Sequence, residues 1–275
     1  MKKVLSALAV SALISGTAVA AEWTEGQPGD VNIGGEIVSS GVKWLWKTGD
    51  GLSSFSNHID EISGRVLNIS VPNDELFLAG KMDKGFKGVF LGNSLIPKVE
   101  MASYDGSVIT PNFITEEKME ITVKVKDAGD GSELGTLDVP LTYGAAVATI
   151  YEKDSHNSAV SRLTGGSIGA VFQGLISPGK YTSIEKTSKW SGLSKAEMAE
   201  YVEALMPGKT ASTSYTSYHT WNDLGHMNYT SADKASHLTY GSGIEANSNL
   251  VMKLNKDVSG RVEWKAPVTI TVTYS

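Results

Sequence analysis

The sequence predicts a mainly β protein built as a sandwich of two sheets. Apolar and polar residues alternate with period 2 in many short stretches, which is the pattern of strands with one buried face. Glycine is abundant, with 29 residues among 275, and Asp-Gly pairs separate several stretches as turns between neighbouring strands do. Short strands at this spacing are typical of a sandwich. Only a central stretch departs from the pattern, because helical signals replace the alternation there.

The first twenty residues have the composition of a secretory signal peptide. Lys2 and Lys3 are basic, Val4–Ile14 is apolar, and Ala18–Ala20 offers the small residues of a cleavage site. The alternative is a retained membrane anchor, but the apolar run is too short to span a bilayer. We therefore expect this segment to be removed, so that an exported chain starts at Ala21.

Alternating stretches then follow one another through the first half of the chain. Val42, Trp44 and Trp46 share one face of an expected strand, and Lys43, Leu45 and Lys47 lie on the opposite face. Such a strand buries only its apolar face. Further strands are expected at Arg65–Val71, Leu76–Ala79, Pro97–Tyr104, Met119–Lys126 and Leu134–Thr142, with turns at Asp50-Gly51, Asp105-Gly106 and Asp130-Gly131.

The stretch from Ala145 to Lys234 carries the helical signals. Ser194 and Glu197 have the spacing of a capping box, and apolar residues recur at i, i+4 and i+7 from Met198. A second, weaker helical pattern covers residues 158–176. We therefore expect a mixed insertion in the sandwich, and insertions on a rigid scaffold are where binding surfaces usually lie.

The two ends of the mature chain carry alternating stretches that lack an obvious partner. At the C-terminal end the alternation lasts for fourteen residues, and a long strand left as an open edge favours aggregation. That strand could pair internally as an ordinary last strand, and the N-terminal stretch could be an ordinary first strand. Together they suggest exchange between chains, in which the tail of one subunit completes the sheet of the next. The apolar face of the tail consists of Val31, Ile33, Gly35 and Ile37.

Composition and spacing argue against several other classes of function. The net charge is −6 and the chain contains no cysteine, so nucleic-acid binding, disulfides and cysteine-ligated metals are not expected. No P-loop occurs. We therefore expect no enzyme, no cofactor and no metal. The one cluster of candidate metal ligands has histidine spacings that match no common zinc motif, and surface histidines are the simpler interpretation: His219, Asp223, His226, Asp233 and His237.

Five stretches of the chain resemble the major subunit of a chaperone–usher fimbria of the FaeG type. This type occurs on enterotoxigenic enteric bacteria, and its shaft subunit is itself the adhesin. Val262 stands where many fimbrial subunits carry glycine, and the absence of a disulfide agrees with the FaeG type. The matching stretches are VNIGGEI (31–37), KWLWKTGDGLSSF (43–55), VFQGL (171–175), LSKAEM (193–198) and EWKAPVTITVTYS (263–275).

The resemblance implies an incomplete immunoglobulin-like sandwich that is completed by donor-strand exchange. Residues 1–20 would be the signal peptide, 21–38 the donor strand, 39–144 and 235–275 the pilin core, and 145–234 an inserted receptor-binding subdomain. The implied partners are neighbouring copies in a fibre, a periplasmic chaperone, an outer-membrane usher and a host glycoprotein or glycolipid. The strand that accepts the donor and contacts the chaperone would present Val262, Trp264, Val268, Ile270, Val272 and Tyr274.

Candidate sugar-binding residues come from two parts of the insertion. Aromatic faces beside polar side chains are what carbohydrate recognition needs, and the segment from Tyr215 to Tyr240 is rich in both. A packed, tyrosine-rich surface is the alternative interpretation. The resemblance implies a sugar pocket just before VFQGL. The candidates are Tyr151, Glu152, Asp154, His156, Asn157, Arg162, Tyr218 and Trp221.

The sequence thus predicts a major fimbrial subunit that polymerises at the cell surface and binds host glycoconjugates. The alternative is a purely structural pilin, with receptor binding on another subunit. The long insertion favours the adhesin, because a shaft subunit does not need it. An outer-membrane β-barrel would need repeated strands of about ten residues with lipid-facing bands, and the helical signals argue against it.

Overall fold

The computed structural model describes residues 41–53, 55–88, 96–153, 158–165, 171–214 and 233–274. These residues form a mainly β fold, as the sequence predicts, and they include two short α-helices. The signal peptide and the expected donor strand lie outside the described residues, so both stay predictions. Among the described helices, none is long and apolar enough to cross a membrane.

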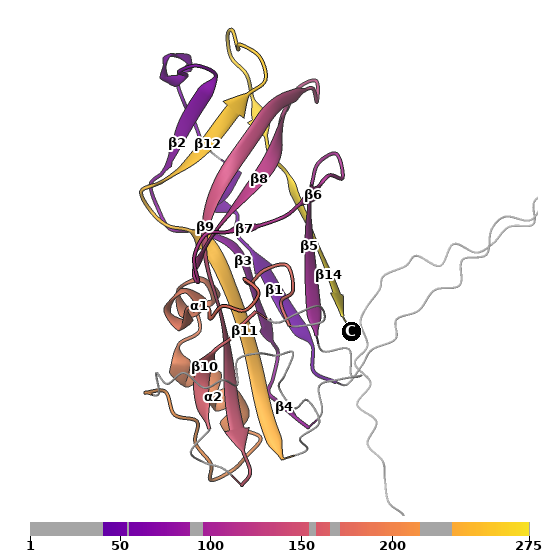
Figure 1. Cartoon of the computed structure of the whole chain (residues 1–275), viewed down its shortest axis with the longest axis vertical. Helices are drawn as coiled ribbons and strands as arrows, with labels where there is room; N and C mark the ends of the chain where they lie inside the picture. Colours follow the sequence, from indigo (N-terminus) through magenta and orange to yellow (C-terminus); the bar gives the residue numbers. More distant parts are fainter. Residues whose placement is uncertain are drawn as a thin grey trace, which may run out of the picture. The chain divides into compact units, whose positions relative to one another are not determined.

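Strands and turns make up most of the described residues, and the two helices follow one another between β10 (Ala159–Arg162) and β11 (Lys234–Ile244) (Figure 1). Two short 3-10 helices, η1 (Gly51–Ser53) and η2 (Ile59–Glu61), follow the first strand. The other elements are β1 (Trp44–Thr48), β2 (Val66–Val71), β3 (Glu75–Met82), β4 (Phe86–Lys87), β5 (Pro97–Ser103), β6 (Val108–Ile109), β7 (Asn112–Phe113), β8 (Lys118–Asp127), β9 (Glu133–Tyr151), β10 (Ala159–Arg162), α1 (Ile184–Ser191), α2 (Lys195–Glu203), β11 (Lys234–Ile244), β12 (Ser248–Leu254), β13 (Trp264–Lys265) and β14 (Val268–Tyr274).

The strands form two antiparallel sheets that share one hydrophobic core. The larger sheet has the order β1-β3-β11-β9-β12-β2, and β8 joins it beside β9. The smaller sheet has the order β14-β5-β6. Apolar residues of both sheets meet between them, including Val99 and Met101 from β5 and Ile121 and Val123 from β8. This arrangement is consistent with an immunoglobulin-like sandwich.

Strand β9 is longer than the sequence predicts, because its second half is buried on both faces. The expected strand ended at Thr142, whereas β9 continues to Tyr151. Small residues fill this half, and α1 packs so closely that a Cβ atom at Gly144 would lie 2.0 Å from the Ser183 carbonyl oxygen. A strand covered on both faces shows no alternation. The helices cover one face of β9 and β11, as Figure 1 shows.

The capping box at the start of α2 is confirmed. The Ser194 hydroxyl accepts a hydrogen bond from the Glu197 amide at 3.2 Å, and the Ser194 amide donates to the Glu197 carboxylate at 2.7 Å. The helical pattern over 158–176 is wrong, because residues 159–162 form β10 and pair with β9. Helix α1, capped by Ser183 and ended by Gly192 in the left-handed region (φ 77°), was not predicted.

Candidate functional site

Strands β14 and β1 each stand at an open edge of a sheet in the part of the chain that the structure describes. Strand β14 pairs with β5 along one edge only, and β1 pairs with β3 along one edge only. A hydrogen bond between Trp46 and Tyr274 and a ring contact between Phe55 and Trp264 place β1 and the segment after it opposite the C-terminal segment. We call the surface between residues 42–62 and residues 258–274 the groove.

The C-terminal wall of the groove carries an incompletely covered apolar row. Val268, Ile270 and Val272 are half-buried, and the threonines between them are exposed. Their neighbours on β5 are fully buried, since Val99 and Met101 are only 3% and 2% exposed. The inner face of the smaller sheet is therefore covered at β5 and left partly open at β14.

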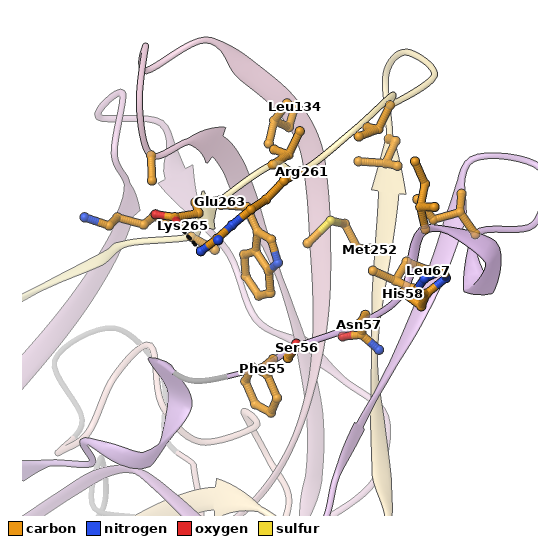
Figure 2. Close-up of a pocket in the computed structure, with 18 of the residues that line it drawn as sticks. Phe55, Ser56, Asn57, His58, Leu67, Leu134, Met252, Arg261, Glu263 and Lys265 are labelled. Atoms are coloured by element: carbon orange, nitrogen blue, oxygen red, sulfur yellow. Dashed lines mark hydrogen bonds and ion pairs between the residues drawn. The ribbon is translucent and has the colours of Figure 1, made fainter.

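One end of the groove widens into a pocket of about 1070 Å³, which we call the end pocket (Figure 2). The rings of Phe55 and Trp264 lie parallel within it, with centroids 6.5 Å apart. An ion pair between Arg261 and Glu263, 2.8 Å long, lies on its C-terminal wall. Its apolar lining includes Leu52, Phe55, Ile62, Leu67, Leu134, Met252, Val262 and Trp264.

The opposite end of the groove is crossed by a hydrogen bond. The Trp46 indole donates from Nε1 to the Tyr274 hydroxyl at 3.0 Å. Trp46 also stacks on Trp44, with a centroid distance of 5.9 Å, and both indoles meet Phe172 edge-on. The two ends of the groove therefore differ: one is a wide apolar pocket and the other is bridged.

All six residues expected on the acceptor strand line this groove or lie at its ends. The single long strand that the sequence predicts is divided into β13 and β14, because Pro267 has no amide hydrogen to donate. The pairing partner also changes at this point, from β8 to β5. Acceptance of a donor strand and contact with a chaperone stay predictions for these residues.

Three of the expected sugar-binding residues lie in the described part of the chain. Tyr151 ends β9 opposite Lys234, whose ammonium lies 5.3 Å from the centre of the Tyr151 ring. The Glu152 carboxylate lies 3.5 Å from the Lys87 ammonium. Arg162 ends β10 and lies 5.0 Å from the Tyr181 ring centre. Asp154, His156, Asn157, Tyr218 and Trp221 lie outside the described residues.

Tyr151 and Arg162 contact different neighbours on the sheet. Arg162 pairs with Ala146 on β9, five residues before Tyr151. At the usual rise of a strand, this offset is about 17 Å along β9. The structure therefore brings Tyr151 together with Lys234, and Arg162 together with Tyr181.

The comparison with known proteins identifies the family of this chain. A family model described as "Fimbrial, major and minor subunit" matches residues 1–275. The chain belongs to this family of fimbrial subunits. The F41 fimbrial protein of Escherichia coli is 67% identical over 277 residues, with 100% of each chain covered. The K88 fimbrial proteins AD and AC of Escherichia coli are 26% and 25% identical over 290 residues, again with 100% coverage of each chain.

Membership confirms the resemblance and the coarse function that the sequence predicts. A fimbrial subunit is a structural component that assembles with other subunits into a fimbrium at the cell surface. The family is not one of enzymes, which confirms that expectation. Among the residues that the structure describes, no three histidine or acidic side chains gather as a metal site would require.

Two residues of the fimbrial subunit have environments that the sequence did not predict. Lys234 is only 8% exposed, and burial lowers the pKa of its ammonium to about 8. His237, expected at the surface, is fully buried in β11. Its Nε2 lies 3.0 Å from the Met82 carbonyl oxygen, and its ring stacks on Tyr201 at 4.0 Å. The only sequence feature that could have indicated the burial of Lys234 and His237 is the run of small residues around them in β11.

The buried histidine is expected to make the fold of the fimbrial subunit less stable in acid. Burial lowers the pKa of His237 to about 4, although the hydrogen bond with the Met82 carbonyl oxygen opposes this shift. The unfolded chain has a pKa near 6.5 at this residue, so it binds the proton first as the pH falls. The free energy of unfolding should therefore decrease by about 3 kcal/mol between pH 6.5 and pH 4 on account of His237 alone.

Denaturant unfolding of the parent and of His237→Gln at several pH values measures this contribution. Between pH 6.5 and pH 4, we expect the free energy of unfolding to fall by about 3 kcal/mol less in His237→Gln than in the parent. The control variant His58→Gln should show the same fall as the parent, because His58 is exposed. Equal pH dependence in the parent and in His237→Gln would show that another group is responsible.

Proposed function

We propose that the subunit polymerises by donor-strand exchange, as the resemblance in its sequence implies. Tail residues 31–37 of one copy form a strand that pairs with the free edge of β14 in the next copy. The observation that carries this proposal is the open side of β14: Ile270 is half-buried, whereas its register partner Met101 on β5 is 2% exposed. An added strand supplies the missing cover.

The apolar face of the tail matches what such a groove requires. Burial of Val31, Ile33 and Ile37 contributes about 1.5–3 kcal/mol each, or about 5–9 kcal/mol together. Main-chain hydrogen bonds to the free edge of β14 add to this. The contact joins two different surfaces of one chain, so it is head-to-tail and generates a fibre when it does not close into a ring.

The same free edge serves the subunit before it joins a fibre. In this proposal the signal peptide directs the chain to the periplasm, where a chaperone lends a strand to β14 and covers its apolar row. An outer-membrane usher then exchanges that strand for the tail of the next subunit. An exposed apolar strand edge would otherwise favour aggregation, which is the physical reason for a chaperone.

Capture of a synthetic tail tests strand exchange directly. A fluorescent peptide of residues 21–38 should bind the purified subunit with a one-to-one stoichiometry, measured by anisotropy. A peptide with the Ile33→Asp change is the matched control and should not bind, because an unpaired charge in an apolar groove costs several kcal/mol. Failure of the unchanged peptide to bind would contradict the proposal.

We also propose that the subunit is an adhesin and that residues 145–234 form its receptor-binding insertion. The supporting observation is the pair of Tyr151 and Lys234 at the β9–β11 end, beside Glu152. An aromatic ring next to charged groups can stack on a sugar and bond its hydroxyls. A host glycoprotein or glycolipid is the proposed partner.

The Tyr151→Ala variant should bind glycans about ten- to a hundredfold more weakly than the parent. Monomeric subunit carrying Ile33→Asp is assayed on a glycan array and then with the soluble sugar that it binds, because many sites along a fibre would mask the loss. Tyr104→Ala is the matched control, since Lys126 lies 4.9 Å from the Tyr104 ring centre on the core sandwich. Equal losses of glycan affinity in Tyr151→Ala and Tyr104→Ala would contradict a binding site at Tyr151. A parent that binds no glycan would favour the purely structural pilin.

A further inference from the structure

The hydrogen bond between Trp46 and Tyr274, which we call the bridge, joins the two walls of the groove. It links β1 to the end of β14 across 228 positions of sequence. The Trp46 side is held firmly: the indole packs over Gly80, where a Cβ atom would lie 2.4 Å from the ring, and meets Phe172 edge-on. The Tyr274 side is 42% exposed. The bridge therefore has a fixed donor and an accessible acceptor.

A strand added to β14 needs the space that the bridge occupies. Neighbouring strands lie 4.7–4.9 Å apart, so an added strand runs between β14 and β1. Its inward side chains must fill the region between the sheets, on the side where Ile270, Val272 and Tyr274 point. A direct hydrogen bond of 3.0 Å between Trp46 and Tyr274 leaves no room for a side chain between the two groups.

We propose that the Trp46–Tyr274 hydrogen bond is a gate on strand exchange. It holds this end of the groove closed in the unfilled subunit and opens when a strand of a neighbouring copy seats along the whole of β14. This inference rests on the proposed donor-strand function. It assigns Trp46 and Tyr274 as the residues that set the rate of strand exchange. Because the bond stabilises only the unfilled state, its removal makes the groove easier to fill.

The change Tyr274→Phe removes only the hydroxyl that accepts the bond. The test uses the full chain carrying Ile33→Asp, whose own tail cannot fill a groove, and the fluorescent 21–38 peptide. Stopped-flow anisotropy gives the association and dissociation rates separately. We expect Tyr274→Phe to bind the peptide roughly two- to tenfold faster, as the loss of one neutral hydrogen bond implies, with dissociation changed by less than twofold.

Two further variants separate the gate from a general effect of substitution. Trp46→Phe removes the donor of the hydrogen bond and should also raise the association rate of the peptide. The double variant Trp46→Phe/Tyr274→Phe should associate no faster than Trp46→Phe alone, because both changes remove the same hydrogen bond. Tyr104→Phe removes a hydroxyl outside the groove and should leave both rates unchanged. Thermal melting of each variant confirms that the fold is retained.

The outcomes distinguish the gate from the function on which it rests. Capture by the parent and by Tyr274→Phe at equal rates would overturn the gate and leave strand exchange standing. Faster dissociation with unchanged association would also overturn it, because the bond would then brace the filled groove. If neither protein captures the peptide, donor-strand exchange fails and the gate fails with it.

Discussion

A subunit carrying Ile33→Asp is expected to form no fibres, while its monomeric complex with a chaperone that lends a strand stays intact. The charge would have to enter the apolar groove beside Ile270 and Val272 without a partner, at a cost of several kcal/mol. That cost is comparable to the whole gain of about 5–9 kcal/mol from burying the tail. Electron microscopy and sedimentation of refolded subunit measure fibre formation. Mixed with the parent subunit, the variant should end growing fibres, since it accepts a strand but cannot donate one.

The matched control is Asn32→Asp, which adds the same charge on the opposite face of the tail. It should leave fibre formation nearly unchanged, because that face points away from the groove in the proposed register. Normal fibres from Ile33→Asp would exclude residues 31–37 as the donor strand. Loss of fibres in both variants would indicate that the added charge, and not the apolar face, is responsible.

The strands predicted best are those with one buried face. Residues 119–126 were expected as a strand and form β8 over Lys118–Asp127, with alternate residues from Met119 to Val125 buried. The second half of β9 was missed because α1 and α2 cover its other face, which removes the alternation. The pattern over 158–176 was assigned to a helix, but β10 pairs with β9 there and Phe172 takes a positive φ of 58°.

The groove could be predicted only in part, because its walls come from opposite ends of the sequence. Alternation identified the apolar faces of residues 42–46 and 262–274, but it carries no information on which residues meet across a gap. The contacts between Trp46 and Tyr274 and between Phe55 and Trp264 depend on how the two sheets pack. The burial of Lys234 and His237 likewise follows from neighbouring elements and not from local sequence.

Deletion of residues 21–37 is expected to leave a subunit that depends on a strand supplied from outside. The tail contributes about 5–9 kcal/mol when it fills a groove, and a whole domain is stable by only about 5–15 kcal/mol. Urea unfolding of the truncated subunit should therefore show a low midpoint and a broad transition. Addition of the 21–38 peptide should raise the midpoint in proportion to the logarithm of its concentration, as for any ligand that binds only the folded state.

The peptide with Ile33→Asp separates strand insertion from non-specific stabilisation in this experiment. It has the same length and nearly the same composition, so an increase in midpoint with the unchanged peptide alone points to the apolar face of the tail. Increases with both peptides would indicate weak, general binding. A truncated subunit that unfolds alone as cooperatively, and at the same midpoint, as it does with peptide would contradict the exchange model, because residues 41–275 would then be complete without a donor strand.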